Sequence, residues 1–282
     1  MQRDLKAYFK TSLALTLMFA STAFACTLRA AVGLHKPPYI FEASNTGLEH
    51  ELFGAAAAAA RCSVQWTHAP PARALTMFRQ GETDVMLTLR EDTTGSAALS
   101  DPYIVYTNVA ISLAARQARI ATIEQLANYH TVAFQNARIA LGDRYRLATS
   151  NPSQYLEAAQ QITQVRMLFS GRTDVIVGDR RILEYLRAEV AREDNAQIRT
   201  KDPIIVHDIF PVTEYRAAFV DTAMRDRFNQ GLAQIRSNGT YGKIIARYRS
   251  PGPLPAPRNH PPAVESPPPI RPAAKISESA LP

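Results

Sequence analysis

The chain has 282 residues, 46% of them hydrophobic, and a formal net charge of +7. Its basic residues form no continuous run and are not interleaved with aromatic residues, which argues against nucleic-acid binding. Six scattered histidines show no metal-ligand spacing, and no nucleophile elbow, phosphate loop or dinucleotide glycine pattern occurs. We therefore predict neither a metal nor a cofactor.

Residues 1–25 have the pattern of a secretory signal peptide. A basic start precedes an apolar run at 13–20, and Ala23-Phe24-Ala25 fits a small-x-small cleavage site. The apolar run is too short for a stable membrane anchor. We therefore predict an exported protein of the periplasm.

The two cysteines, Cys26 and Cys62, each precede a predicted strand, at 28–33 and 64–67. Two strands joined by one helix would be parallel neighbours, so their starts would lie at the same end of a sheet. A Cys26–Cys62 disulfide fits this arrangement and an oxidising compartment. The alternative is a lipid-bearing Cys26, although Ala23 stands where such signals usually have leucine.

The predicted elements alternate between helix and strand along the rest of the chain. After strand 28–33 we expect a helix from Glu49 through the alanine run, strand 64–67, helix 71–80, strand 84–89 and an extended stretch 104–114. Then follow helix 122–127, strand 130–134, helix 138–146, helix 156–169, strand 174–178, helix 179–191, strands 204–206 and 215–220, and helices 222–237 and 240–248. This order indicates an α/β fold.

An eleven-residue phrase occurs twice, at 77–87 and at 167–177, and each copy contains Gly-x-Thr-Asp before an apolar run. Each copy reads as a helix end, a glycine in the left-handed conformation and a buried strand. Such a strand is typical of a parallel sheet covered on both faces. Two copies favour two similar α/β lobes with a ligand between them, although two neighbouring units of one large sheet would give the same repeat.

Residues 250–282 contain eleven of the nineteen prolines and very few large apolar residues. Such a segment cannot bury enough apolar surface to offset its ordering entropy. We predict a disordered tail that contributes little to stability.

The chain resembles the extracellular solute-binding proteins of family 3, the periplasmic amino-acid-binding components of ABC transporters. The matching segments follow one another in family order: Lys36-Pro37-Pro38-Tyr39, Gly47-Leu48-Glu49-His50-Glu51-Leu52, Leu99-Ser100-Asp101-Pro102-Tyr103, Thr131–Gln135, Gly171–Asp179 and Asn238–Ile244. The resemblance implies a two-lobed periplasmic-binding-protein-like fold with two hinge strands. Lobe 1 would comprise 26–106 plus 214–249 and lobe 2 would comprise 107–213, with hinges near Tyr103–Thr107 and Val212–Tyr215.

The resemblance also implies site residues. Asp179 matches the family's aspartate that receives a ligand ammonium, although an aspartate before helix 180–190 would equally serve as an N-cap. The family's carboxylate-binding arginine is missing from 93–98. Arg90 or Arg73 could replace it, or either could be a solvated surface arginine.

Four further residues are candidates. Lys36 replaces the family's usual aromatic before the proline pair, so a stacking platform must come from Tyr39 or Phe41, unless these are core residues. Thr88 lies near the end of its strand. Gln135 and Asn136 follow a strand and could donate to a ligand carboxylate, or they could be turn residues.

Together these features predict a monomeric periplasmic protein that binds an amino acid or a related zwitterion or carboxylate for an ABC permease. The alternatives are a ligand-sensing receptor and an enzyme like the cyclohexadienyl or arogenate dehydratases. The enzyme would need a catalytic acid, for which Glu157 or Glu184 could be nominated, although each fits a surface helix better.

Overall fold

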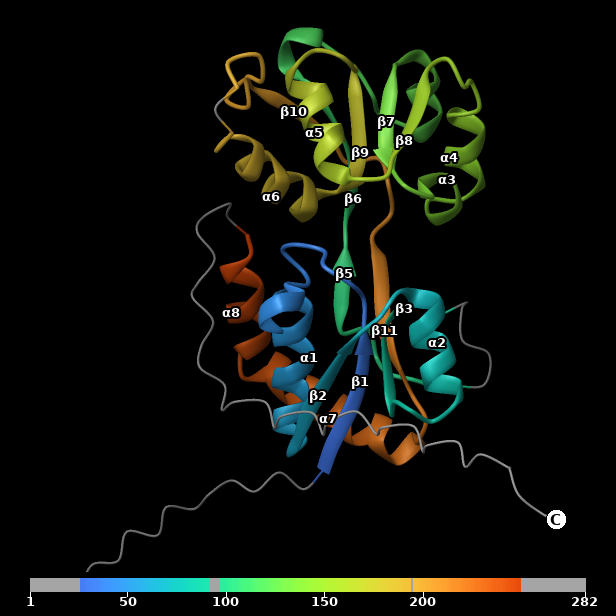
Figure 1. The fold of residues 1–282 in the computed structure, drawn as a ribbon, viewed down its shortest axis with the longest axis vertical. Helices are drawn as coiled ribbons and strands as arrows, with labels where there is room; N and C mark the ends of the chain where they lie inside the picture. The colour runs from blue at the N-terminus through green and yellow to red at the C-terminus, as the bar shows by residue number, and fades with distance from the viewer. Residues whose placement is uncertain (1–25, 92–96, 194, 250–282) are drawn as a thin grey trace, which may run out of the picture.

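The computed structural model describes residues 26–91, 97–193 and 195–249. The predicted signal peptide and the proline-rich tail therefore lie outside the described residues. Of the segment 93–98, where the family usually has its carboxylate-binding arginine, the structure describes only Ala97 and Ala98. The chain forms two α/β lobes stacked along the long axis (Figure 1). Within the described part, no helix is both long and apolar enough to span a bilayer.

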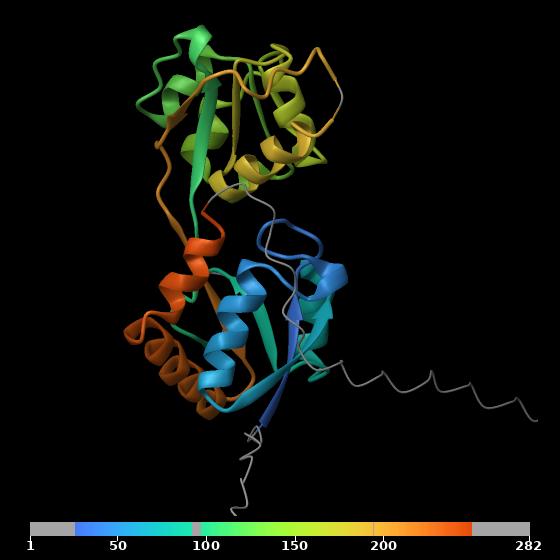
Figure 2. The same cartoon turned by 90° about the vertical axis from the view of Figure 1, so that its left-hand side faces the viewer.

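Lobe 1 is built on a mixed sheet in the order β2-β1-β3-β11-β4, with β5 also pairing with β11. Its elements are β1 (Cys26–Val32), η1 (Glu42–Ser44), α1 (Leu48–Ala59), β2 (Cys62–His68), α2 (Pro71–Arg79), β3 (Val85–Leu89), β4 (Ala98–Leu99), β5 (Ile104–Tyr106), β11 (Thr213–Phe219), α7 (Thr222–Ser237) and α8 (Thr240–Arg247). Figure 2 shows α1, α7 and α8 together on one side of this sheet, and α2 packs against β1 and β3 on the other. Alternate residues of β1 and β3 therefore enter two separate apolar clusters.

Lobe 2 is built on a mixed sheet in the order β10-β6-β9-β7-β8. Its elements are β6 (Asn108–Leu113), η2 (Ala114–Arg116), η3 (Ile123–Asn128), β7 (Thr131–Phe134), α3 (Ala137–Ala140), α4 (Asp143–Ala148), β8 (Tyr155–Ala158), α5 (Gln161–Phe169), β9 (Val175–Asp179), α6 (Arg180–Val190) and β10 (Ile204–His207). Strand β9 is buried along its whole length. Its Ile176 packs on one face of the sheet, and Val175 and Val177 pack on the other.

The chain crosses between the lobes twice. It leaves lobe 1 between β5 and β6, at Thr107, and returns between β10 and β11, through residues 208–212. The two crossings run side by side in Figure 1. Because β5 pairs antiparallel with β11, the two crossings are tied together at the lobe 1 end.

The repeated phrase occupies equivalent places in the two lobes, which excludes the single-sheet alternative. Gly81 and Gly171 adopt positive φ values of 71° and 73° at the ends of α2 and α5. Asp84 accepts a hydrogen bond from the Arg29 backbone N–H at 2.9 Å, and Asp174 accepts one from the His130 N–H at 3.1 Å. In each copy the aspartate therefore ties the start of its strand to the neighbouring strand.

In each copy of the repeated phrase, an arginine from elsewhere in the chain contacts both the aspartate and the glycine. Arg29 pairs with Asp84 at 2.6 Å and donates to the Gly81 carbonyl at 3.0 Å. Arg116 pairs with Asp174 at 3.6 Å and donates to the Gly171 carbonyl at 3.1 Å. These contacts give both aspartates a structural role.

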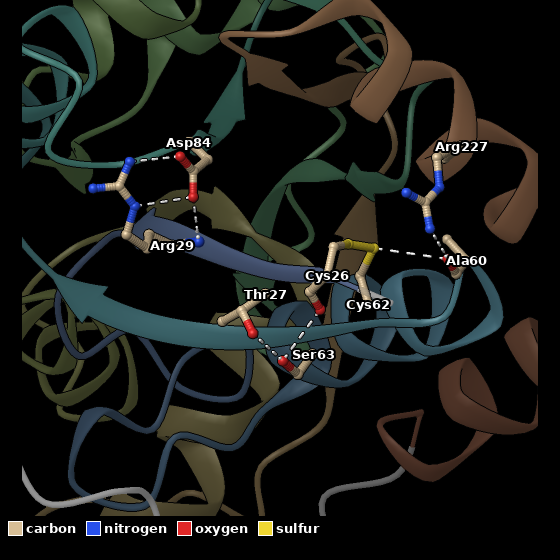
Figure 3. The surroundings of a disulfide bond; sticks show 8 residues. All are labelled: Cys26, Thr27, Arg29, Ala60, Cys62, Ser63, Asp84 and Arg227. Carbon is tan, nitrogen blue, oxygen red and sulfur yellow. Dashed lines mark hydrogen bonds and ion pairs between the residues drawn. A yellow bond between two sulfur atoms is a disulfide. The ribbon is translucent and has the colours of Figure 1, made fainter. Parts of the chain in front are cut away.

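The predicted disulfide between Cys26 and Cys62 is present, which confirms the pairing inferred from the strand order (Figure 3). The two residues stand opposite each other at the start of the parallel β1–β2 ladder, with their Cα atoms 4.6 Å apart. Ser63 reinforces this corner by bonding to the Thr27 hydroxyl at 2.9 Å.

Three sequence expectations differ from the structure. The sheets are mixed, because the long strands β11 and β6 pair antiparallel with β3 and β9. The helix predicted at 138–146 is two short helices, α3 and α4, because Gly142 has a positive φ of 83° between them. The helix predicted at 156–169 begins only at Gln161, since residues 155–158 form the edge strand β8.

Candidate functional site

A group of polar and aromatic side chains lies where the two lobes meet, and we refer to it as the interlobe cluster. It comprises Lys36, Tyr39, Glu49, Thr88, Tyr103 and Tyr106 from lobe 1 and its exit strand, together with Asp179 and Arg181 from lobe 2. The cluster contains two buried carboxylates, since Glu49 is 0% exposed and Asp179 is 4% exposed. Buried carboxylates need hydrogen-bond donors or cations around them, so their partners define the site.

The loop before α1 places Tyr39 and Glu49 together. The N–H groups of Leu48 and Glu49 donate to the carbonyls of Pro38 and Tyr39, both at 3.0 Å. Gly47 makes this docking possible, because a Cβ atom there would lie 2.3 Å from the Tyr39 carbonyl oxygen, and its φ is +122°. The first turn of α1 and the loop that carries Tyr39 therefore form one unit.

Glu49 is surrounded by hydroxyl donors. Tyr103 donates to its Oε1 at 2.6 Å, Tyr106 donates to its Oε2 at 3.3 Å, and the Thr88 hydroxyl also donates to Oε1. Thr88 has a positive φ of 61°, and its N–H donates to the Tyr103 hydroxyl at 3.2 Å. The predicted residue Thr88 thus reaches the cluster as a partner of a buried carboxylate.

Asp179 is both the N-cap of α6 and a link between the lobes. Its Oδ1 accepts from the N–H groups of Arg181 and Ile182 at 3.0 and 3.2 Å, and its Oδ2 accepts from the Thr107 N–H at 2.9 Å. The Tyr39 hydroxyl of lobe 1 donates to both oxygens, at 3.0 and 3.1 Å. Burial raises the pKa of Asp179, and these donors partly offset the rise.

An aromatic stack connects the two carboxylates. The rings of Tyr39 and Tyr106 lie 4.0 Å apart at an interplanar angle of 23°, and Tyr215 packs edge-on against Tyr106 at 4.8 Å. Because Tyr39 bonds to Asp179 and Tyr106 bonds to Glu49, the stack joins both acids in one network. Tyr39 is fully buried and stacks on Tyr106 of the same chain, so the structure gives it the surroundings of the alternative, a core residue.

Lys36 brings a cation into this network. Its ammonium nitrogen lies 4.7 Å from the centre of the Tyr106 ring and 6.0 Å from that of Tyr39. Burial lowers the pKa of Lys36, and the charges of Glu49 and Asp179 act against that decrease. Two ring faces and two carboxylates therefore offset part of the cost of burying this cation.

Two arginines approach the cluster from opposite lobes. Arg181, at the start of α6, donates to the Tyr39 hydroxyl of lobe 1 at 3.5 Å. Arg90, which follows β3 in lobe 1, donates to the carbonyl of Ala140 in lobe 2 at 3.3 Å, and its positive charge also acts on Tyr215. The candidate Arg90 therefore lies at the lobe boundary, although its side chain is more exposed than the cluster.

The other predicted ligand-binding residues lie elsewhere. Arg73 pairs with Glu82 at 3.4 Å on the exposed surface of α2. Gln135 and Asn136 are exposed at the turn between β7 and α3, where Asn136 has a positive φ of 62°. The structure does not bring these three residues into the cluster.

Both acids nominated for elimination chemistry have structural partners. Glu157 accepts from the N–H groups of Asn136 and Arg138 at 2.7 and 3.1 Å, and from the Tyr155 hydroxyl at 2.9 Å. Glu184 pairs with Arg180 at 2.9 Å along α6. Across the described parts of the chain, no group of three or more histidine, cysteine or acidic residues could hold a metal ion.

Sequence reasoning missed five members of the cluster as functional residues: Lys36, Glu49, Tyr103, Tyr106 and Arg181. Glu49 carried a usable signal, because it lies between Leu48 and Leu52 on a helix whose apolar residues must face the core. An acid at such a position is buried and needs partners. Arg181 carried no such signal, since it follows another arginine at a helix start.

Comparisons with known proteins agree on the fold. The family model of bacterial extracellular solute-binding proteins, family 3, matches residues 28–251. No curated protein matches the chain significantly. Many solved structures do match it, all those described below at less than 25% identity, which shows the fold alone.

Three of these structures illustrate the range of functions. A histidine kinase sensor domain similar to periplasmic binding proteins has a TM-score of 0.60 and 18% identity, over 79% of this chain and 96% of that one. An ancestral arginine-binding protein bound to arginine has a TM-score of 0.58 and 20% identity, over 79% and 98%. An ancestral amino-acid-binding protein described as a precursor of cyclohexadienyl dehydratase has a TM-score of 0.56 and 19% identity, over 79% and 94%.

Proposed function

Because the chain belongs to the bacterial extracellular solute-binding proteins of family 3, we propose that it captures a small polar solute between its lobes. The observation that carries this proposal is the interlobe cluster, in which two buried carboxylates are joined across the lobe boundary by Tyr39. A solute that entered here would contact both lobes, and it would favour the arrangement in which they are close.

The proposed lobes are residues 26–106 plus 214–249 and residues 107–213, with hinges near Tyr103–Thr107 and Val212–Tyr215. We place the protein in the periplasm as a monomer that delivers its solute to an ABC permease. A sensor would use the same capture step, and the fold shared with a histidine kinase sensor domain supports that alternative equally. Neighbouring permease and ATPase genes would favour transport, and an adjacent sensor kinase gene would favour sensing.

Binding rather than catalysis is the better supported role. The acids that could serve elimination chemistry are Glu157, which accepts three hydrogen bonds, and Glu184, which pairs with Arg180. A general acid needs a proton that it can deliver to a substrate, and both of these acids are instead engaged by partners within the chain.

Two solute classes fit the cluster: a zwitterion whose ammonium Asp179 accepts, and a carboxylate without an ammonium. In both, Arg90 would hold the carboxylate.

A thermal-shift screen of amino acids, polyamines and organic acids, followed by calorimetry, tests this function. Once a ligand is found, Arg90→Ala should weaken it at least about thirtyfold, since losing one partner of a desolvated charge pair costs about 2–5 kcal/mol. Arg73→Ala is the matched control, because Arg73 is an arginine of the same lobe that pairs with Glu82. If no solute stabilises the protein, the binding function is wrong. If Arg90→Ala binds like the parent, the carboxylate is held elsewhere.

A further inference from the structure

We propose that the solute is a small carboxylate without an ammonium group, and that Lys36 of the chain itself takes the place of a bound cation. This inference rests on the function proposed above and narrows the solute class of the same site. It follows from three features: the surroundings of Lys36, the hydrogen bonds that Glu49 and Asp179 already accept, and the presence of cationic side chains on both lobes.

Lys36 has the surroundings of a bound ammonium ion. Its nitrogen lies over the ring of Tyr106 at 4.7 Å, with the ring of Tyr39 at 6.0 Å. Aromatic faces combined with carboxylates are the environment that proteins use to hold ammonium ligands. Glu49 and Asp179 supply the two negative charges that act on Lys36. A cation from solution would have to enter beside a positive charge that is already in place.

The carboxylates are also engaged by donors from the chain. Asp179 accepts hydrogen bonds from three backbone N–H groups and from the Tyr39 hydroxyl. Glu49 accepts from Thr88, Tyr103 and Tyr106. A ligand ammonium could reach Asp179 only by displacing the hydroxyl of Tyr39, a side chain that is fully buried. This displacement would leave the buried Tyr39 hydroxyl without its hydrogen-bond acceptor, which costs free energy.

Donors for an anion, by contrast, come from both lobes. Lys36 and Arg90 belong to lobe 1, and Arg181 belongs to lobe 2. Within the part of the chain that the structure describes, the Lys36 ammonium has ring and charge neighbours but donates no hydrogen bond. A carboxylate bound between the lobes would therefore accept from cationic side chains of both lobes.

The test compares matched pairs of probes that differ only in the α-amino group. The pairs are glutarate with L-glutamate, succinate with L-aspartate and 4-methylpentanoate with L-leucine, and inorganic phosphate distinguishes carboxylate recognition from general anion binding. Calorimetry on the full mature chain should show the deaminated member of at least one pair binding at least about tenfold more tightly. Phosphate should bind more weakly than that carboxylate.

Two variants of Lys36 complete the test. Lys36→Met, which keeps the length and apolar character of the side chain, should weaken the carboxylate at least about tenfold and improve binding of the paired amino acid. Lys36→Arg keeps the charge and should keep the preference for the carboxylate. Circular dichroism and thermal melting establish that each variant is folded, and Lys36→Arg keeps the proposal testable if Lys36→Met does not fold.

The outcomes separate this inference from the proposed function. If an amino acid binds the parent more tightly than its deaminated partner, or if phosphate binds best, the solute class is wrong while the binding function stands. If Lys36→Met leaves the preference unchanged, Lys36 does not act as the internal cation. If neither these probes nor the wider screen bind the parent, the proposed function itself is overturned.

Discussion

Tyr39 of lobe 1 donates its hydroxyl to both carboxylate oxygens of Asp179 in lobe 2, at 3.0 and 3.1 Å. The two residues are 140 positions apart in the sequence, and both are buried. Asp179 also caps α6, so a single carboxylate orders a helix start and holds the opposite lobe. The distance between the lobes is thereby coupled to the packing of one tyrosine.

Removing that hydroxyl should loosen the contact between the lobes. Tyr39→Phe should lower the free energy of unfolding by about 1.5–3 kcal/mol, the usual contribution of a hydrogen bond to a charged group. It should also increase the radius of gyration in small-angle scattering. Tyr155→Phe is the control, because it removes a tyrosine–carboxylate bond, to Glu157 at 2.9 Å, that lies within lobe 2. An unchanged radius for Tyr39→Phe would show that other contacts hold the lobes together.

Glu49 should contribute strongly to stability although it is an acid. Glu49→Ala leaves the hydroxyls of Thr88, Tyr103 and Tyr106 without their acceptor and removes a counter-charge of Lys36. Breaking a buried charge network in this way costs about 3–5 kcal/mol. Urea unfolding measures the loss. Glu124→Ala, which removes an exposed partner of Arg144, should leave the midpoint almost unchanged.

A loss below about 1 kcal/mol for Glu49→Ala would contradict the role that we assign to the three hydroxyls. In that case the hydroxyls would find other acceptors in the folded protein. The double variant Glu49→Ala with Lys36→Met would then separate the two contributions, since it removes both charges of the pair.

Stability should fall in mild acid because of His50. Burial, followed by the charge of His68, lowers the pKa of His50 to about 3, against 6.5 for the unfolded chain. Between these two values the unfolded state binds a proton that the folded state does not. The associated stability is therefore complete above pH 6.5 and is lost as the pH falls towards 3, by at most about 5 kcal/mol.

His50→Leu should flatten this acid-side loss in urea midpoints measured between pH 7.5 and 4.5. The groups that face His50 are His68, whose Nε2 lies 3.3 Å from the Nε2 of His50, and the ring of Trp66. Burial lowers the pKa of His68 as well, so part of the slope should remain. His130→Leu, at an exposed histidine, should keep the full slope. An equally steep slope in His50→Leu would place the acid sensitivity elsewhere.

The Cys26–Cys62 bond should form in the exported protein. Intact-mass analysis after alkylation without reduction should show no alkylated thiol, and reduction should cost about 3–4 kcal/mol of stability on the loop-entropy estimate for this spacing of 36. Two alkylated thiols, or a lipid on Cys26, would contradict the disulfide.

The sequence by itself indicated the family, favoured the pairing of the cysteines and determined the existence of two similar units. These features are local: the repeated glycine and aspartate set a helix end and a strand start, and each cysteine precedes a strand. The position of Asp179 before α6 is equally local, because an N-cap depends only on its own helix. Boundaries such as the break at Gly142 were missed, since a glycine inside a helical pattern does not by itself end the helix.

Only the tertiary structure decided which side chains share the interlobe cluster. Lys36, Glu49 and Asp179 come from three separate segments and meet through the rings of Tyr39 and Tyr106, and no periodicity in the sequence brings them together. Whether a charged side chain is solvated or buried depends on packing between elements that are distant along the chain. For the same reason Arg73, a candidate by sequence, lies on the surface, whereas Lys36, noticed only for the aromatic that it replaces, supplies a cation within the site.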